Sequence, residues 1–175
     1  MSKFAQIFTV ILIFGVLFAF PASAQESEVT KADLQKIYMQ SLNGIGDSVI
    51  LDEDDDIVFN FLERRYYIII DEDNPMFFRI YREIDLGSFS AEAAMPIANE
   101  FNRYRWTKFY ISERSERRSV AINTELLLSN FSILPNPQNI RTTLIKALNI
   151  MRISEDRFFS RLESSASSTT VSSAQ

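Results

Sequence analysis

The sequence predicts an α+β domain with a mainly antiparallel sheet flanked by helices, in the order α-β-β-β-α-β-β-α. The first observation is that Ile57–Tyr81 alternates short runs of β-branched and aromatic residues with turn formers, which is typical of an antiparallel meander. The second is that apolar residues recur at helical spacing before and after this stretch. The third is a further pair of strand-like segments between two helical patterns. This order of elements favours an α+β architecture.

The first 24 residues have the pattern of a cleavable secretory signal. A basic start is followed by the apolar segment Ile7–Phe20 and by Pro21-Ala22-Ser23-Ala24, a small-residue exit. The apolar segment is shorter than the ~20 residues that a membrane-spanning helix needs. We therefore expect cleavage after Ala24, a periplasmic or secreted protein, and no stable membrane insertion afterwards.

A first helix is predicted over Glu26–Leu42. Thr30 is the expected N-cap, and Asp33 three residues later completes a pattern like a capping box. Asn43-Gly44 should end the helix, since glycine readily takes the left-handed cap conformation. A short strand at Val49–Leu51 is expected before the acidic run of residues 52–56.

The meander itself should contain strands at Ile57–Leu62, Tyr66–Ile70 and Met76–Tyr81. Turns are predicted at residues 63–65 and 71–75. The pattern is unusual because apolar residues occupy both faces of these strands. If helices of the same chain cover one face, the other face needs a partner, a ligand or a second subunit.

The second half begins with a predicted loop over Arg82–Ser90, followed by a helix. Pro96 either kinks this helix or occupies its first position, where the missing N–H costs nothing. Trp106–Ser112 and Ser119–Leu127 then form a second predicted hairpin, since apolar and polar residues alternate in both.

A crossing loop over residues 128–135 should lead into a long C-terminal helix. Asn136 is its expected cap and Pro137 its first residue. Residues 154–156 could interrupt it by capping a second piece. From Ser164 the composition predicts a disordered tail, so the domain is assigned to residues 25–163. The predicted buried face of the helix contains Ile140, Leu144, Ala147, Leu148, Met151, Phe158 and Leu162.

Composition argues against several classes of function. The chain has a net charge of -5, and binding to nucleic acid needs a clustered positive surface. It has no histidine, the commonest general base, and no cysteine nucleophile. Only four glycines are present, and they form no phosphate-binding loop. We therefore predict no enzymatic activity, no cofactor and no nucleic-acid partner.

The acidic run resembles a calcium loop only in part. Asp52, Asp54, Asp56 and Glu63 have the spacing of EF-hand ligands, but Ile57 stands where the loop requires glycine. We therefore predict no EF-hand and no metal site. The acidic turns of the first hairpins should lie near each other, and a solvated sheet end is favoured over weak binding of a divalent cation.

Aromatic and apolar residues of the strands are the candidates for a binding surface, because tyrosine and tryptophan are enriched at protein interfaces. Core packing is the alternative for each of them singly. The predicted interface residues are Phe59, Tyr66, Tyr67, Ile69, Phe77, Tyr81 and Trp106.

Four segments together resemble the YbjN domain family: Asp55–Asn60, Arg65–Ile80, Ala98–Asn102 and Lys108–Ile111. The resemblance extends over Val29–Leu162, and the strand, acidic turn and following strand are its most specific part. It implies a fold similar to that of type III secretion chaperones. Such domains are small, typically dimeric, and bind partner polypeptides without catalysing a reaction.

The leading hypothesis is an exported, non-enzymatic protein-binding module of chaperone-like or regulatory type, forming a homodimer through its sheet face and neighbouring helices. An alternative is a carrier that holds a small apolar or lipid-like ligand in a concavity between sheet and helices. A weak sensor of divalent cations is a third hypothesis.

Overall fold

A computed structural model describes residues 29–71, 77–103, 106–114, 117–127 and 136–172. The predicted signal segment, the turn at residues 72–75 and the crossing loop at residues 128–135 lie outside this part. The described elements are α2 (Lys31–Leu42), β1 (Asp47–Leu51), β2 (Ile57–Phe61), β3 (Arg64–Ile70), β4 (Phe77–Asp85), α3 (Ala91–Phe101), β5 (Lys108–Arg114), β6 (Arg117–Leu127) and α4 (Pro137–Ser172).

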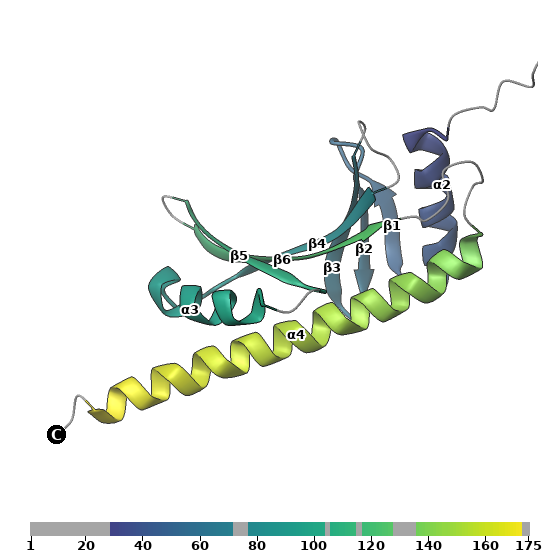
Figure 1. Cartoon of the computed structure of the whole chain (residues 1–175). Coiled ribbons are helices and arrows are strands. Elements are labelled where there is room, and N and C mark those ends of the chain that lie inside the picture. Colours follow the sequence, from purple (N-terminus) through teal and green to yellow (C-terminus); the bar gives the residue numbers. More distant parts are fainter. Residues whose placement is uncertain (1–28, 72–76, 104–105, 115–116, 128–135, 173–175) are drawn as a thin grey trace, which may run out of the picture.

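The six strands form one sheet in the order β1-β2-β3-β4-β6-β5, and every neighbouring pair is antiparallel. The α+β prediction is therefore confirmed. Figure 1 shows α4 running along one side of the sheet, with α3 near the β5 end and α2 near the β1 end. The sheet bends away from these helices, so its other face is concave and carries none of the described helices.

The core lies between the sheet and α4. Alternate residues of the central strands point to the helices, as period-two patterning requires, and β2 aligns with β3 so that Ile57 lies opposite Ile68 and Phe59 opposite Tyr66. The predicted face of α4 is buried in full, which confirms its helical spacing. The largest fully buried side chains are Tyr38, Tyr66, Phe59, Phe78, Phe109, Phe158, Leu34, Leu42, Ile57, Ile68, Ile80 and Leu86.

The helix starts follow the local sequence. Thr30 and Asp33 form a reciprocal capping box, in which Thr30 Oγ1 accepts from the Asp33 N–H and Asp33 Oδ2 accepts from the Thr30 N–H. Gly44 has a φ of 75°, the left-handed conformation predicted for it. At the start of α4, Asn136 Oδ1 accepts from the Gln138 N–H at 2.8 Å. Both predicted N-caps are therefore confirmed.

Several strand boundaries differ from the prediction, and two of these differences have a clear structural cause. The first turn contains Leu62 and Glu63, with φ values of 50° and 63°, and Arg64 already pairs with Phe61. These angles are those of a two-residue hairpin turn that follows the twist of the strands. Strand β4 continues to Asp85 where a loop was predicted, because β6 pairs with it along its whole length.

The helices also differ from the prediction at two places. Pro96 lies inside α3, so it is not the first residue of that helix. Helix α4 passes through residues 154–156 without interruption and continues to Ser172, beyond the predicted start of a disordered tail at Ser164. The side chains of Glu155 and Asp156 pair with arginines and do not cap a new helix. An existing helix also extends at low cost, because only nucleation is unfavourable.

Candidate functional site

The structure separates the predicted interface residues into three groups. Phe59 and Tyr66 are fully buried beneath the helices, which corrects their assignment to the open face. The physical reason is the period of two along a strand, since Phe59 lies two residues from core-facing Ile57 and Tyr66 lies two residues from core-facing Ile68. Four others, Tyr67, Ile69, Phe77 and Tyr81, belong to the alternate positions on the concave face. Trp106 lies apart from both groups, beside α4.

The concave face is less apolar than predicted. Tyr67 and Tyr81 pack edge to face with ring centroids 6.0 Å apart. Toward β6, however, Arg79 pairs with Glu125 at 2.9 Å, and the buried Asn123 takes the position opposite Tyr81. Polar residues therefore share this face, which can remain solvated on the β6 side.

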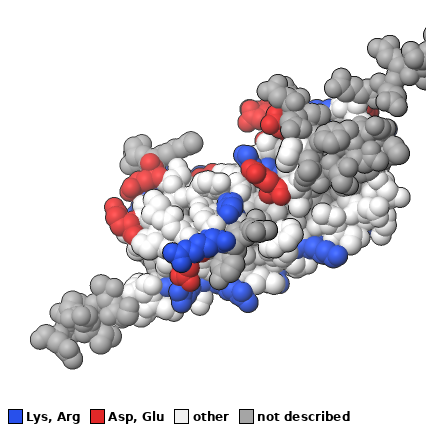
Figure 2. Space-filling view, in the orientation of Figure 1, with Lys and Arg blue, Asp and Glu red and all other residues white. Residues whose placement is uncertain are grey.

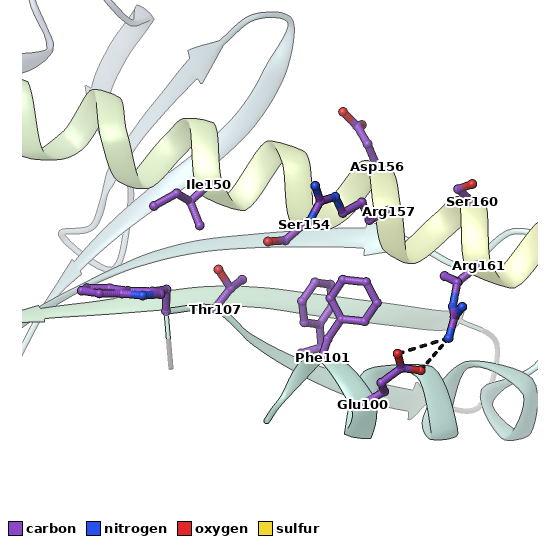
Figure 3. A pocket seen from close by; sticks show the side chains of 11 residues that line it. Glu100, Phe101, Thr107, Ile150, Ser154, Asp156, Arg157, Ser160 and Arg161 are labelled. Atoms are coloured by element: carbon purple, nitrogen blue, oxygen red, sulfur yellow. Dashed lines mark hydrogen bonds and ion pairs between the residues drawn. The ribbon is translucent and has the colours of Figure 1, made fainter. Parts of the chain in front are cut away.

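A cleft lies beside Trp106 on the described part of the chain. It has a volume of about 590 Å³ and lies between α3, the start of β5 and α4. Figure 3 shows residues of α3 and of the β5 segment on one side and residues of α4 on the other. Its lining contains Glu100, Phe101, Trp106, Thr107, Phe109, Ile150, Ser154, Asp156, Arg157, Ser160 and Arg161.

Aromatic stacking fixes the floor of the cleft. The ring of Phe109 on β5 stacks on Phe158 of α4, with centroids 5.0 Å apart. Phe101 of α3 meets Phe109 edge to face at 5.2 Å and Phe158 at 6.1 Å. Such pairs add stability beyond the area they bury. The three elements around the cleft are therefore locked together by one aromatic cluster.

Hydrogen bonds fix the backbone that leads into β5. The side chain of Asn102 pairs with the backbone of Phe109, donating to its carbonyl at 2.8 Å and accepting from its N–H at 2.7 Å. Thr124 donates its hydroxyl to the carbonyl of Trp106 at 2.7 Å. The indole of Trp106 nevertheless stays 67% exposed. The backbone is thus held in place while a large aromatic side chain remains open to solvent.

Most charged groups of the cleft are already paired. Arg161 and Glu100 join α4 to α3 at 2.8 Å, and Asp156 pairs with Arg64 at 2.8 Å. Arg157 makes no ion pair with any described residue. Thr107 is 4% exposed, and its Oγ1 has no hydrogen-bond partner in the described part of the chain. The cleft therefore presents one unpaired cation and one unsatisfied hydroxyl.

A second cavity of about 240 Å³ adjoins the cleft. Trp106 and Ile150 line both spaces. The lining of the second cavity is almost wholly apolar, and the hydroxyls of its two threonines, Thr124 and Thr143, donate to the backbone carbonyls of Trp106 and Asn139. The two cavities are therefore adjacent, with Trp106 and Ile150 in the lining of both. The other lining residues are Thr124, Leu126, Thr143, Lys146 and Ala147.

A buried ionic cluster behind the cleft was missed from the sequence. Glu155 of α4 is 7% exposed and pairs with Arg82 at 3.0 Å and Arg64 at 3.4 Å. Burial raises the pKa of Glu155 above its ordinary value, and the two arginines partly oppose that rise. The guanidinium of Arg82 also lies 5.4 Å from the ring centre of Tyr66. This cluster connects α4 to the sheet.

The described residues offer no metal site and no membrane span. No group of three or more histidine, cysteine or acidic side chains is placed to hold a metal ion in this part of the chain. Asp52 instead accepts hydrogen bonds from the backbone N–H groups of Asp54 and Asp56. A strand begins at Ile57, where an EF-hand loop would still be turning. None of the described helices is long and apolar enough to cross a bilayer.

Comparison with known proteins supports the fold and does not assign a function. No protein-family model matches the chain, and no curated protein matches it. An uncharacterized protein from Methanothermobacter thermautotrophicus is similar in structure, with a TM-score of 0.54 and 13% identity, over 74% of this chain and 96% of that one. YbjN from E. coli, described as a proposed transcription regulator, has a TM-score of 0.46 and 10% identity, over 74% and 89% of the two chains. At these identities the likeness concerns the fold alone, and membership of the YbjN family stays a prediction.

Proposed function

We propose that this chain is a non-enzymatic binding module and that the cleft beside Trp106 is its ligand site. The observation that carries the proposal is the mostly apolar cavity of about 590 Å³ beside a tryptophan that is 67% exposed. Small-molecule sites are typically concave, largely apolar and ~300–1,000 Å³ in volume, with a few polar groups that fix orientation. The aromatic cluster and the Asn102 clamp hold this cavity open before any ligand arrives.

The chemistry of the cleft supports binding over catalysis. Its two carboxylates, Glu100 and Asp156, are held in ion pairs with arginines. The chain contains no histidine or cysteine that could serve as general base or thiol nucleophile. A site with these groups can hold and orient a ligand, and we assign it no reaction.

The proposal can be tested with a neutral apolar dye, N-phenyl-1-naphthylamine, whose emission rises on entering an apolar site. Trp106 is the only tryptophan in the chain, so its fluorescence reports on this cleft directly. We expect saturable dye binding at one site per chain, with energy transfer from Trp106. The absence of saturable binding would overturn the proposal.

Two isoleucines of α4 supply a matched control. Ile150 is 40% exposed and lines both cavities, whereas Ile153 is 42% exposed and lines neither of the two. Ile150→Asp should weaken dye binding at least tenfold, because it places a charge against an apolar ligand. Ile153→Asp should leave dye binding unchanged. Equal effects of the two substitutions would place the dye elsewhere.

Protein binding through the concave face is a second candidate function. It is favoured by the concave sheet face that none of the described helices covers in Figure 1 and by the exposed Phe77 beside half-buried Tyr67, Ile69 and Tyr81. Light scattering over a dilution series would detect a homodimer of this kind. A dimer that Tyr67→Asp dissociates without unfolding supports it, and a monomer at every concentration opposes it.

Export remains part of the proposal, on the strength of the signal pattern ending at Ala24. Expression in a bacterial host followed by mass spectrometry of the periplasmic and medium fractions tests it. A product that begins at Gln25 in either fraction is expected. An intact product confined to the cytoplasm opposes export.

A further inference from the structure

We infer that the cleft takes an elongated amphipathic anion, of which a fatty-acid carboxylate is the simplest member. The carboxylate would bind beside Arg157 and Thr107, and the alkyl chain would run past Trp106 and Ile150 into the second cavity. This inference rests on the proposed function, since it names the ligand class for the same cleft.

One charged side chain of the cleft has no ion pair among the described residues. Four charged residues line the cleft: Glu100, Asp156, Arg157 and Arg161. Glu100 pairs with Arg161, and Asp156 pairs with Arg64, which lies outside the lining. Arg157 is the remaining cation and has no ion pair among the described residues. A guanidinium recognises a carboxylate by charge-assisted hydrogen bonds, which are about twice as strong as neutral ones. An anionic head group is the partner that Arg157 lacks.

The wall of the cleft also contains a hydroxyl without a hydrogen-bond partner among the described residues. A buried polar group without a partner costs free energy, and native structures contain few of them. Thr107 Oγ1 is such a group in the wall of this cleft. Figure 3 shows that hydroxyl pointing toward α4, while Ser154 and Arg157 lie on the side of α4 that faces it. A ligand oxygen between them would satisfy the hydroxyl and the guanidinium together.

The apolar space beside the cleft suits an extended hydrocarbon chain. The second cavity is almost wholly apolar and shares Trp106 and Ile150 with the cleft. A compact anion such as phosphate would leave this space empty. A chain of methylene groups fills it, and burial of each methylene contributes favourably to binding.

The charge distribution agrees with an anionic ligand despite the net charge of -5. In the view of Figure 2, lysine and arginine side chains predominate along the lower side of the molecule, over α4, whereas aspartate and glutamate predominate along the upper side. A local positive field raises the concentration of anions near a site even on an acidic protein.

Decanoate and 1-decanol separate the head group from the tail, and both can be titrated against the purified protein by Trp106 fluorescence and calorimetry. Decanoate should bind saturably at one site per chain, shift the Trp106 emission to shorter wavelength, and bind at least tenfold more tightly than decanol. Arg157→Gln should remove that tenfold advantage while leaving decanol binding unchanged. Arg65→Gln, the same change of charge on an exposed residue in another part of the molecule, should alter neither affinity.

Other outcomes distinguish this inference from the proposed function. Equal affinities for decanoate and decanol, unaffected by Arg157→Gln, would overturn the anion inference and leave an apolar ligand site. Binding of the naphthylamine dye without binding of either decyl compound would overturn the ligand class alone. Failure of all three compounds to bind would overturn both.

Thr107→Val tests the hydroxyl separately, because valine keeps the shape and removes Oγ1. If the hydroxyl serves a ligand, decanoate affinity should fall severalfold while the unliganded protein becomes more stable to heat. A variant that is less stable and binds decanoate as before would overturn the role of Thr107.

Discussion

Strand β4 carries one arginine on each face of the sheet, and the two residues are three positions apart. On the concave face, Arg79 pairs with Glu125 at 2.9 Å, and the two side chains are 46% and 60% exposed. On the covered face, Arg82 pairs with Glu155 at 3.0 Å, and the two side chains are 16% and 10% exposed. The two N···O distances are nearly equal, so the pairs differ mainly in how much solvent reaches them.

The surroundings decide what each pair does. Water and salt screen the exposed pair, which then contributes little to stability. The covered pair has lost most of its hydration, so each charge is stabilised mainly by its partner, and removal of one partner destabilises the fold. Glu155 also precedes Asp156, which lines the cleft and holds Arg64. The covered pair therefore adjoins the wall of the cleft, whereas the exposed pair lies on the opposite face of the sheet.

The largest predicted effect tests the identity of the two faces. Ile68 is fully buried under the helices, while its neighbour Tyr67 is half-buried on the concave side. Ile68→Asp should abolish folding, since an unpaired charge would be placed in the core. Tyr67→Asp should leave a cooperative thermal transition, measured by circular dichroism. If both variants unfold, the concave face is not a free surface.

The next effect concerns the buried pair. Glu155→Ala should lower the free energy of unfolding by about 3 kcal/mol, the lower end of the range for breaking a buried pair. The lower end applies because Arg64 keeps 25% of its side chain exposed, so water can reach part of the freed charge. Urea denaturation measures this change.

A double variant distinguishes the ion pair from the packing. If the loss comes from unpaired arginine charge, Arg82→Met should recover part of it in the Glu155→Ala background, because removing the second charge removes its desolvation cost. Losses that simply add would mean that Glu155 acts through packing alone.

The pH dependence should reveal the burial of Glu155. Its pKa is raised above the ordinary value of 4.5, so the folded state holds this proton more strongly than the unfolded state does. Stability from this group is then fully present below pH 4.5 and is lost as pH rises through the folded-state pKa. The wild type should lose stability relative to Glu155→Gln over that interval in urea titrations. A gain with rising pH would mean that Arg64 and Arg82 outweigh burial.

The same contrast shows what the sequence could and could not predict. The α+β order, both N-caps and the buried face of α4 follow from local signals, namely capping residues and helical or alternate spacing. The length of β4 could not be read locally, because pairing with the distant β6 extends it to Asp85. The β-strand propensities of individual residues contain no information about such long-range pairing.

The candidate site was predicted only in part. Trp106 was named for its residue type, but its position beside α4 depends on how α3, β5 and α4 pack together. The sequence does contain a signal for the buried cluster. Glu155 falls between Met151 and Phe158 in the apolar stripe of α4, and Arg82 continues the core-facing alternation of Phe78 and Ile80. A charge at a core position of each of two elements indicates a buried pair between them.

The smallest predicted effect completes the comparison. Arg79→Ala and Glu125→Ala, singly and together, should give a coupling energy of about 0–1 kcal/mol, because both side chains are exposed and screened by salt. Raising the salt concentration should reduce even this coupling. The corresponding cycle for Arg82 and Glu155 should keep most of its coupling in salt, since little solvent reaches that pair. If the two cycles gave equal coupling energies with equal salt dependence, solvent exposure would not be what distinguishes the two ion pairs. A large coupling for Arg79 and Glu125 would instead indicate that a partner covers the concave face in solution and shields this pair from water.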